Sequence, residues 1–414
     1  MDENLDEIKW TLKKYSQEHL LNGYENLSEK GQKELIQQIK GIDFEMMKSL
    51  YENTKKEPKV EDFSIKPIDY IDKDKLYDNY KKYQAIGAEA IKNRKLVAVT
   101  MAGGQGTRLG HKGPKGTFDI GLESHKSLFE LLSDGLKEQG RKYDVIIPWF
   151  VMTSRENNDD TIEFFAKNRY FGYEKDKNLF FFKQEELPMV DMEGKILIGE
   201  DGLIKEAANG HGGIYEALVK NGMTKKMREL GAEWVFIGGV DNCLVKMVDP
   251  VLMGIAIDKN VTAAGKSVVK ANPQEKVGVF CKKNGRPSVI EYTEIPEDMA
   301  EQVDKNGDLV FGESHILCNL FNIDAIERMG SKPLPYHTAF KKATYIDKDG
   351  NKVVPDSPNA YKFEAFLFDA FGELDDMAIM RVKREEEFAP VKNATGTDSP
   401  ETARELYRKF YHLK

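Results

Sequence analysis

The stretch VAVTMAGGQGTRLG, at residues 97–110, decides the fold, and PKG at residues 114–116 follows it closely. Its first half is apolar and β-branched, which predicts a buried β-strand. Its second half is a loop of glycines, which let the backbone approach a ligand and turn N–H groups toward an anion. Arg108 and Lys115 add two cations beside that loop. The stretch therefore predicts a polyphosphate-binding loop at the end of a central strand.

Two common phosphate-binding motifs do not fit this loop. The dinucleotide fingerprint G-x-G-x-x-G fails because Leu109 stands where its last glycine belongs. The P-loop pattern fails because Lys115 is followed by Gly116 and Thr117 rather than directly by serine or threonine. These mismatches disfavour an NAD-linked oxidoreductase and a Walker-type nucleotide site.

The sequence beyond the loop predicts an α/β fold, because short apolar strands alternate with helical stretches. The expected strands are residues 96–101, 145–153, 179–182 and 234–240, and the expected helices lie around 126–139, 161–167 and 213–230. Open α/β sheets bind ligands at the carboxyl ends of their parallel strands. Gly103, Gln184 and Asp241 each follow an expected strand, so we expect them at one edge of the sheet.

Past residue 260 the pattern changes to a predicted hairpin. Residues 277–281 and 287–292 flank the pair Asn284-Gly285, which is typical of a two-residue hairpin turn. We therefore expect a Rossmann-like mixed sheet that is mainly parallel and is covered by helices.

The length of 414 residues exceeds one ordinary core, which predicts a large domain with an appendage. Residues 1–92 are charge-rich with apolar residues at helical spacing, interrupted by Pro58 and Pro67, and are expected to form a helical N-terminal appendage. Residues 93–396 are expected to form the catalytic domain. Residues 397–414 are expected to form a C-terminal helix that begins at the cap Ser399.

The composition limits the possible binding partners of the protein and its cellular compartment. The net charge of −8 disfavours binding to nucleic acid or to an anionic membrane surface. No stretch approaches the roughly 20 apolar residues of a membrane helix, and the acidic N-terminus does not resemble a secretory signal. Cys243, Cys281 and Cys318 lack metal or disulfide spacing. We therefore expect a cytoplasmic protein with free thiols.

Six further motifs occur in a fixed order after the glycine loop. They are FKQEELP at 182–188, GHGGIY at 210–215, VDN at 240–242, VIEY at 289–292, FLFD at 366–369 and PVKNA at 390–394. With the loop, they make the chain resemble the UDP-sugar pyrophosphorylases, and within these the UDP-N-acetylhexosamine pyrophosphorylases. The resemblance implies a fold of the nucleotide-diphospho-sugar transferase type. It also implies uridylyl transfer from UTP to a sugar 1-phosphate, N-acetylglucosamine 1-phosphate being favoured, with UDP-sugar and pyrophosphate as products.

The resemblance also assigns roles to particular residues. It implies catalytic roles for Arg108, Lys115 and Lys392. It implies nucleotide binding by Ala102, Gly103, Gly104, Gln184, Gly210, His211 and Asp241, where Gly212 would also allow a close approach, and sugar binding by Gly278, Glu291, Tyr292 and His315. Asp241 is further expected to hold Mg²⁺, which takes one or two carboxylates together with phosphate oxygens and water. Asp369 is a weaker metal candidate, because it could equally be one exposed acid on a core helix.

Two positions depart from the family pattern and leave alternatives open. His211 and His315 stand where N-acetylhexosamine enzymes commonly carry asparagine, and UDP-glucose pyrophosphorylases carry histidine at the first of these positions. Glucose or galactose 1-phosphate is therefore the alternative substrate. A non-catalytic UDP-sugar-binding protein is a second alternative. It is disfavoured by four retained residues, namely Arg108, Lys115, Asp241 and Lys392.

Overall fold

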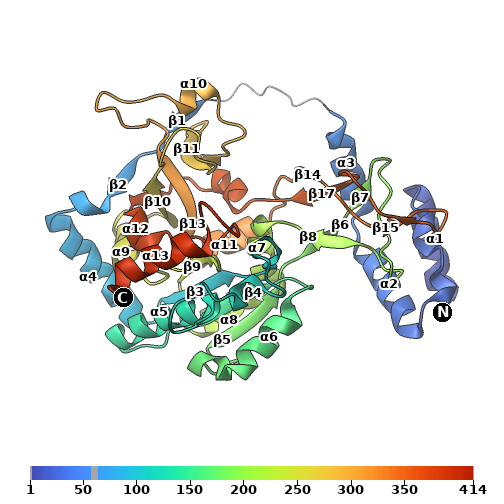
Figure 1. Cartoon of the computed structure of the whole chain (residues 1–414), viewed down its shortest axis with the longest axis horizontal. Helices are drawn as coiled ribbons and strands as arrows, with labels where there is room; N and C mark the ends of the chain where they lie inside the picture. The colour runs from blue at the N-terminus through green and yellow to red at the C-terminus, as the bar shows by residue number, and fades with distance from the viewer. Residues whose placement is uncertain (1, 57–63, 414) are drawn as a thin grey trace. The chain divides into compact units, whose positions relative to one another are not determined.

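The apolar run that opens the decisive stretch forms β3 (Leu96–Met101), whose six residues are all buried. The computed structural model describes residues 2–56 and 64–413. On either side of β3 lie its parallel neighbours β9 (Trp234–Gly239) and β4 (Trp149–Thr153), and β5 (Leu179–Lys183) follows β4. These are the four predicted strands, and Figure 1 shows them side by side. The predicted parallel sheet is therefore confirmed.

Four more strands extend this sheet beyond β9. They are β13 (Glu313–Asn322), β10 (Ala263–Val269), β18 (Ala378–Arg381) and β2 (Tyr70–Asp72), in the spatial order β2-β18-β10-β13-β9-β3-β4-β5. β13 is antiparallel to both of its neighbours, whereas the other pairs along this path are parallel. The sheet is thus mixed and mainly parallel, as expected.

A small hairpin joins the same sheet at β13. It consists of β11 (Val279–Lys283) and β12 (Arg286–Ile290), and β1 (Ile65–Pro67) pairs with β11. The turn residues Asn284 and Gly285 have φ angles of 51° and 82°. Two positive φ angles are what the predicted two-residue turn requires.

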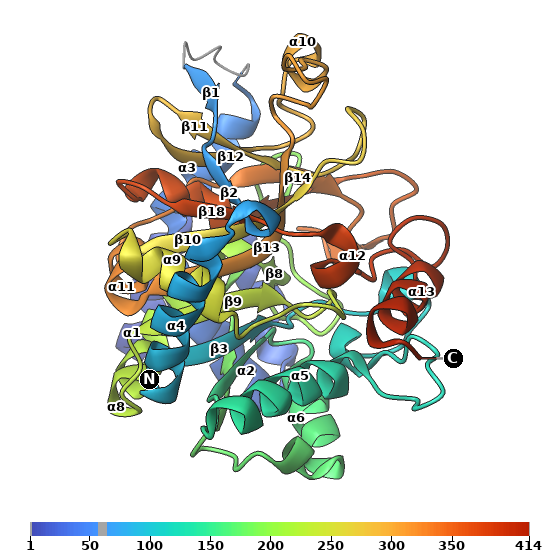
Figure 2. The same cartoon turned by 90° about the vertical axis from the view of Figure 1, so that its left-hand side faces the viewer.

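One face of the sheet is covered by α4 (Asp78–Lys92), α5 (Leu128–Tyr143) and α9 (Pro250–Asp258), which share a core with Leu96 and Ala98. Helices α4 and α9 pack directly on each other (Figure 2). A Cβ at Gly87 of α4 would lie 1.8 Å from the carbonyl oxygen of Pro250. Glycine at this position therefore allows the two helices to cross closely.

The opposite face carries Val97 and Val99, which alternate with the residues above and are also fully buried. Tyr215 of α7 (Ile214–Lys220) packs edge-on against Phe321 of β13, with ring centroids 5.6 Å apart. The single helix predicted over residues 213–230 is wrong, because Gly222, with φ of 70°, separates α7 from α8 (Met223–Glu229).

The chain folds into two compact units, each built from three separate segments. Unit 1 comprises Met1–Asp62, Glu185–Gly213 and Leu334–Phe366, and unit 2 comprises Phe63–Gln184, Ile214–Pro333 and Leu367–Lys414. In unit 1 the helices α1 (Asp2–Lys14), α2 (Glu29–Gly41) and α3 (Phe44–Thr54) share a core with residues of its other two segments. The predicted N-terminal helices are confirmed, whereas β1, β2 and α4 belong to unit 2. Pro58 lies outside the described residues.

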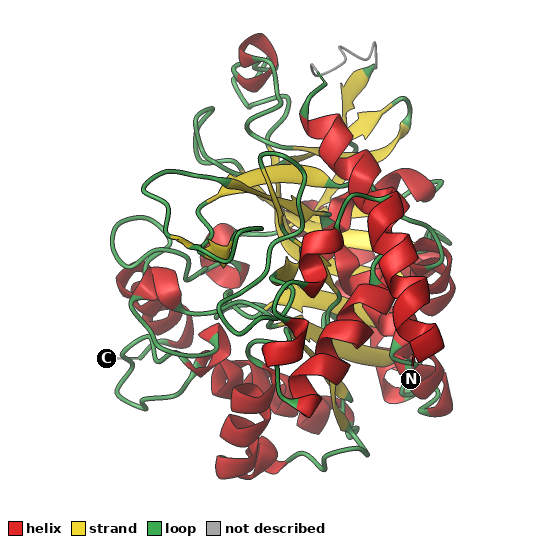
Figure 3. Cartoon of the chain, turned by 90° about the vertical axis from the view of Figure 1, so that its right-hand side faces the viewer, coloured by secondary structure: helices red, strands yellow, loops and turns green. Residues whose placement is uncertain are grey.

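Figure 3 shows the distribution of helices, strands and loops. The remaining helices are α6 (Asn158–Lys167), α10 (Glu297–Ala300), α11 (Ile323–Gly330), α12 (Arg384–Glu387) and α13 (Pro400–Tyr411), and the remaining strands are β6 (Glu186–Pro188), β7 (Val190–Asp191), β8 (Glu206–Ala208), β14 (His337–Lys341), β15 (Tyr345–Ile346), β16 (Lys352–Val353) and β17 (Ala360–Glu364). The predicted C-terminal helix begins with a capping box in which Ser399 and Thr402 satisfy each other's backbone N–H groups. Among residues 2–56 and 64–413, no helix combines the length and apolar character needed to span a bilayer.

Candidate active site

The glycine loop leaves the sheet at the carboxyl end of β3. The N–H of Ala102 still donates to Met152 of β4, at 2.8 Å, and the chain then turns out of the sheet. The N–H of Gly106 donates to the Gly113 carbonyl and that of Lys115 donates to the Gly104 carbonyl, both at 3.0 Å. The loop therefore closes on itself and brings the backbone of Lys115 against its first glycines.

Gly103 and Gln184, which the sequence places at the same edge of the sheet, lie in contact. A Cβ at Gly103 would lie 2.9 Å from the carboxamide atoms of Gln184. The N–H of Gln184 donates to the Thr153 carbonyl at 2.8 Å, which fixes its backbone just beyond β5. Any side chain at position 103 would displace the Gln184 amide, so the contact itself requires glycine.

Several N–H groups of the loop remain available to a ligand. Within the described part of the chain, those of Gly103, Gly104 and Gln105 donate no hydrogen bond. A Cβ at Gly104 would meet nothing within 4 Å. Arg108 lies in the short 3₁₀ helix Thr107–Leu109, is exposed, and has no ion pair among the residues that the structure describes. The loop thus offers N–H donors and an unpaired guanidinium.

Lys115 and Asp241 form an ion pair, with the Lys115 Nζ 3.2 Å from the Asp241 Oδ2. Their side chains are 18% and 26% exposed, so both remain accessible to a ligand. Burial by itself would raise the pKa of Asp241, but the positive charges of Lys115 and Lys392 outweigh it and hold that pKa below its usual value. The carboxylate is therefore charged at neutral pH.

Lys392 is held near Asp241 by the backbone but has another partner. The N–H of Val391 donates to the carbonyl of Asp241 at 2.9 Å. The Lys392 Nζ lies 3.4 Å from the Asp398 Oδ2, and the Lys392 N–H donates to the Asp398 carbonyl at 2.6 Å. Lys392 thus affects Asp241 through its charge, while its ammonium group is paired with Asp398.

Asn242 joins the Asp241 turn to the segment that carries Lys392, a role that the sequence reasoning missed. It is 3% exposed. Its Nδ2 donates to the Glu387 carbonyl at 2.7 Å, and its Oδ1 accepts from the Ala389 N–H at 2.9 Å. No local signal in the sequence could have suggested these contacts, because the partners lie 145 and 147 residues further along the chain.

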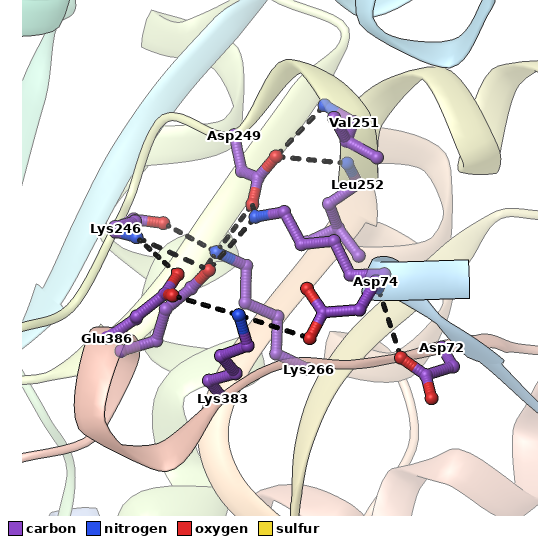
Figure 4. A network of polar contacts seen from close by, with 11 residues as sticks. Asp72, Asp74, Lys246, Asp249, Val251, Leu252, Lys266, Lys383 and Glu386 are labelled. Carbon is purple, nitrogen blue, oxygen red and sulfur yellow. Dashed lines mark hydrogen bonds and ion pairs between the residues drawn. The ribbon is translucent and has the colours of Figure 1, made fainter. Parts of the chain in front are cut away.

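A buried charge cluster, defined as Lys73, Lys266, Asp249 and Glu387, anchors the same C-terminal segment. The Lys266 Nζ, which is fully buried, lies 2.9 Å from the Asp249 Oδ2 and 2.5 Å from the Glu387 Oε2. The Lys73 Nζ lies 3.1 Å from each of these two acids. Figure 4 shows Lys266 reaching Asp249, with Lys246 and Glu386 at the margin of the cluster.

The predicted sugar-binding residues Gly278, Glu291 and His315 lie together in unit 2. The His315 N–H donates to the Gly278 carbonyl at 2.9 Å. A Cβ at Gly278 would lie 2.7 Å from the Glu291 Oε1, so a side chain there would collide with this carboxylate. Tyr292 follows and is 43% exposed. The backbone of His315 therefore lies with Gly278 and Glu291, and these three residues with Tyr292 are called the sugar cluster below.

The ring of His315 is enclosed. It is 9% exposed, and three phenylalanine rings pack edge-on to it with centroids 5.0 to 5.8 Å away, namely Phe280, Phe368 and Phe371. Its Nε2 lies 3.2 Å from the Asn319 Nδ2. Most of the imidazole surface is thus used in packing.

Gly210 and His211 belong to unit 1. A Cβ at Gly210, whose φ is 87°, would lie 2.3 Å from the Ala365 carbonyl oxygen, and one at Gly212 would lie 2.7 Å from the Phe366 carbonyl. The His211 ring packs on Phe366 with centroids 5.4 Å apart. Close packing on residues 365–366 already requires these glycines, and their contact with a nucleotide stays a prediction.

Asp369 lies in the 3₁₀ helix Leu367–Glu373 among buried apolar residues. Burial raises the pKa of Tyr215, and the charge of Asp369 adds to that effect. No group of three or more His, Cys, Asp or Glu side chains suited to a metal occurs in residues 2–56 and 64–413. A metal-binding role for Asp369 therefore stays a prediction from the sequence.

Comparisons with known proteins agree with this geometry. The family model of UTP–glucose-1-phosphate uridylyltransferase matches residues 43–397. The chain is 35% identical to the probable UDP-N-acetylglucosamine pyrophosphorylase of Dictyostelium discoideum, over 96% of this chain and 86% of that protein. It is also 35% identical to the UDP-N-acetylglucosamine pyrophosphorylase of Saccharomyces cerevisiae, over 95% and 87%.

A solved structure extends the agreement to three dimensions. The uridine diphosphate N-acetylglucosamine pyrophosphorylase of Trypanosoma brucei superposes with a TM-score of 0.80 at 33% identity, covering 98% of this chain and 84% of that one. The mixed sheet described above is therefore that of the UDP-sugar pyrophosphorylases. The chain belongs to the UTP–glucose-1-phosphate uridylyltransferase family, and it is an enzyme of that family.

Proposed function

We propose that the enzyme transfers the uridylyl group of UTP to N-acetylglucosamine 1-phosphate, releasing pyrophosphate and forming UDP-N-acetylglucosamine. The observation that carries this proposal is the ion pair of Lys115 and Asp241 beside the glycine loop, at the carboxyl ends of β3 and β9. The substrate is supported by the relatives about 35% identical, which are UDP-N-acetylglucosamine pyrophosphorylases.

The proposed reaction is an in-line displacement, which needs positioning and charge neutralisation more than a covalent nucleophile. A phosphate oxygen of the sugar 1-phosphate attacks the α-phosphorus of UTP, and pyrophosphate leaves. The N–H groups of Gly103, Gly104 and Gln105 would bind phosphate oxygens, with Arg108 beside the leaving pyrophosphate. Lys115 would neutralise charge at the α-phosphate. Lys392 would do so after exchanging Asp398 for a phosphate.

Mg²⁺ is the proposed cofactor, and the donor chemistry of the site fits it. Mg²⁺ is bound through one or two carboxylates together with substrate phosphates and water, rather than by an all-protein cage. Asp241 offers one charged, partly exposed carboxylate. When bound, the ion would neutralise phosphate charge, and Asp241 would exchange its Lys115 contact for the ion.

The proposed nucleotide and sugar contacts follow the residues that the structure brings together. Gln184, with the backbone near Gly103, would recognise uracil, since an amide offers both donor and acceptor. Among the sugar-cluster residues, Glu291 would accept hydrogen bonds from sugar hydroxyls.

The proposed location is the cytoplasm. The three cysteines are free and buried, and burial raises the pKa of Cys243 to about 12 and that of Cys281 to about 11. Such thiols are protonated and unreactive, which suits a reducing compartment.

The decisive experiment measures pyrophosphate release from UTP and Mg²⁺ with four sugar 1-phosphates. These are the 1-phosphates of N-acetylglucosamine, N-acetylgalactosamine, glucose and galactose. We expect the highest kcat/KM with N-acetylglucosamine 1-phosphate. A preference for glucose or galactose 1-phosphate would overturn the proposed substrate. It would indicate that His211 and His315 determine the choice of sugar. Folded protein that binds UTP but releases no pyrophosphate would overturn catalysis and favour a UDP-sugar-binding protein.

A further inference from the structure

Asn157 lies beyond the carboxyl end of β4 at the N-cap position of α6, where its side chain makes no capping hydrogen bond, and it has no exposed surface. Its Nδ2 donates to the carbonyl of Ala102 at 2.8 Å and to that of Gly104 at 3.3 Å. Its Oδ1 accepts from the Ser154 N–H at 2.9 Å, and its own N–H donates to the Ser154 Oγ at 3.2 Å. A buried side chain thus holds the peptide that joins Ala102 to Gly103 and the peptide that joins Gly104 to Gln105.

These contacts fix the orientation of the amide. Rotating it by 180° would place Oδ1 against the carbonyl oxygens of Ala102 and Gly104 and place Nδ2 against the Ser154 N–H. Like groups would then oppose each other at all three contacts of a side chain that has no exposed surface. The side-chain amide of Asn157 can therefore satisfy its hydrogen bonds in only one of its two orientations.

Holding the two carbonyls also orients two N–H groups. The carbonyl of Ala102 and the N–H of Gly103 share one trans peptide, so they point in opposite directions. The same holds for the carbonyl of Gly104 and the N–H of Gln105. Both N–H groups are therefore turned away from Asn157, and neither donates a hydrogen bond within the part of the chain that the structure describes.

The Gly104 carbonyl connects this arrangement to Lys115. It accepts from the Lys115 N–H at 3.0 Å as well as from Asn157. Displacement of the Gly104 peptide would therefore move both a candidate phosphate donor and the backbone of the candidate catalytic lysine.

We propose that Asn157 is a positioning residue that aims the N–H groups of Gly103 and Gln105 at the phosphates of UTP. The inference rests on the proposed function, and it adds a residue that none of the recognised motifs contains. Asn157 acts through the loop and does not touch the substrate. Its loss leaves the Ala102 carbonyl without a donor and the Gly104 carbonyl with the Lys115 N–H alone, which loosens both peptides.

The test compares Asn157→Ala and Asn157→Ser with the wild-type chain. Serine is also favoured at an N-cap position but is too short to reach both carbonyls. Asn178→Ala is the matched control, because Asn178 is also a buried asparagine (9% exposed) that accepts a backbone N–H, at the opposite end of β5. UTP binding is measured by calorimetry without sugar phosphate, and kcat and both KM values are measured by pyrophosphate release.

We expect both Asn157 variants to bind UTP about ten- to a hundredfold more weakly, with KM for UTP rising in parallel. The KM for the sugar phosphate should change by less than about twofold, a separation that general loss of structure would not produce. The Asn178 control should bind UTP as the wild type does. Unchanged UTP binding in both folded variants, or an equal loss for both substrates, would overturn the inference. A wild-type chain that neither binds UTP nor releases pyrophosphate would instead overturn the proposed function.

Discussion

Replacing Lys266 with methionine is expected to lower the free energy of unfolding of unit 2 by about 3–5 kcal/mol, the range for removing one partner from a buried ion pair. Methionine keeps most of the length and the apolar character of the lysine side chain. The loss therefore reports on charge rather than on an empty cavity.

The magnitude follows from the burial of the cluster. Lys266 contacts both Asp249 and Glu387, whose side chains are 5% and 2% exposed. Without Lys266, the two carboxylates keep Lys73, 3.1 Å from each, and Glu387 also keeps Lys246 at 3.8 Å. The two buried carboxylates would then share Lys73, and the more distant Lys246 is 32% exposed, so their charge would be poorly compensated, which is the situation that costs most.

The effect of pH has a defined sign. Burial would raise the pKa of Asp249, but Lys266 and Lys73 outweigh it and hold that pKa well below its usual range. A depressed carboxyl pKa stabilises the fold above the unfolded value of about 3.9, and that stabilisation is lost as pH falls toward the folded value. Lys266→Met removes much of the depression. The difference between variant and wild type should therefore be full at pH 7 and should shrink below about pH 4.

Urea unfolding followed by tryptophan fluorescence provides the assay, in a Trp10→Phe background. Trp10 is 67% exposed in unit 1, whereas Trp149 and Trp234 are buried in the core of unit 2, so the remaining signal reports on unit 2. Lys82→Met is the matched control, because Lys82 is 53% exposed and pairs with Asp258 at the surface. We expect the control to cost less than about 1 kcal/mol. If Lys266→Met costs no more than Lys82→Met, the reasoning from buried charge is refuted.

Three shorter predictions concern the site and its support. Asp241→Asn should raise the Mg²⁺ concentration needed for half-maximal rate by about tenfold or more, and an unchanged Mg²⁺ titration would make Asp241 a structural residue. Lys115→Ala should lower kcat by about 10²–10³ in folded protein, and near-normal turnover would remove its catalytic role. Gly116→Ala would place a Cβ 2.2 Å from the Phe129 ring and should cost about 1–3 kcal/mol in urea unfolding. Gly135→Ala, where a Cβ meets nothing within 4 Å, should not destabilise.

The parts of the fold that the sequence predicts well depend on local patterns. β3 and β5 are continuous apolar runs, the hairpin turn has Asn284-Gly285, and α13 starts at a cap followed by proline. Each signal lies within a few residues. The expected edge of the sheet follows as well, because the carboxyl ends of parallel strands must meet at one edge.

The grouping of unit 1 has no such local signal. Its strands β6, β7 and β8 are two or three residues long, too short to show a period. Contacts such as that of Gly210 with Ala365 join residues far apart in the chain. The boundary at residue 92 rests on charge and helical spacing and that at residue 397 on the cap Ser399, and both stay predictions.

Buried polar residues were the hardest part of the site to predict. A lone lysine or asparagine in a sequence is usually solvated, and nothing local distinguishes Lys266, Asn157 or Asn242 from such residues. Their partners lie on distant segments: Asn157 contacts the loop after β3, and Asn242 contacts residues 387 and 389. The sequence therefore predicts the residues that would touch substrate better than those that hold them in place.

Glu387 links the stability of unit 2 to the geometry of the site. Its side chain is the acidic partner of Lys266, and its carbonyl accepts from Asn242, next to Asp241. The segment that follows it continues to Lys392 through the contact of Val391 with Asp241. A change that loosens Glu387 must therefore loosen the backbone that sets Lys392 relative to Asp241. Lys266→Met should accordingly lower kcat as well as stability, even though Lys266 is fully buried and cannot touch a substrate.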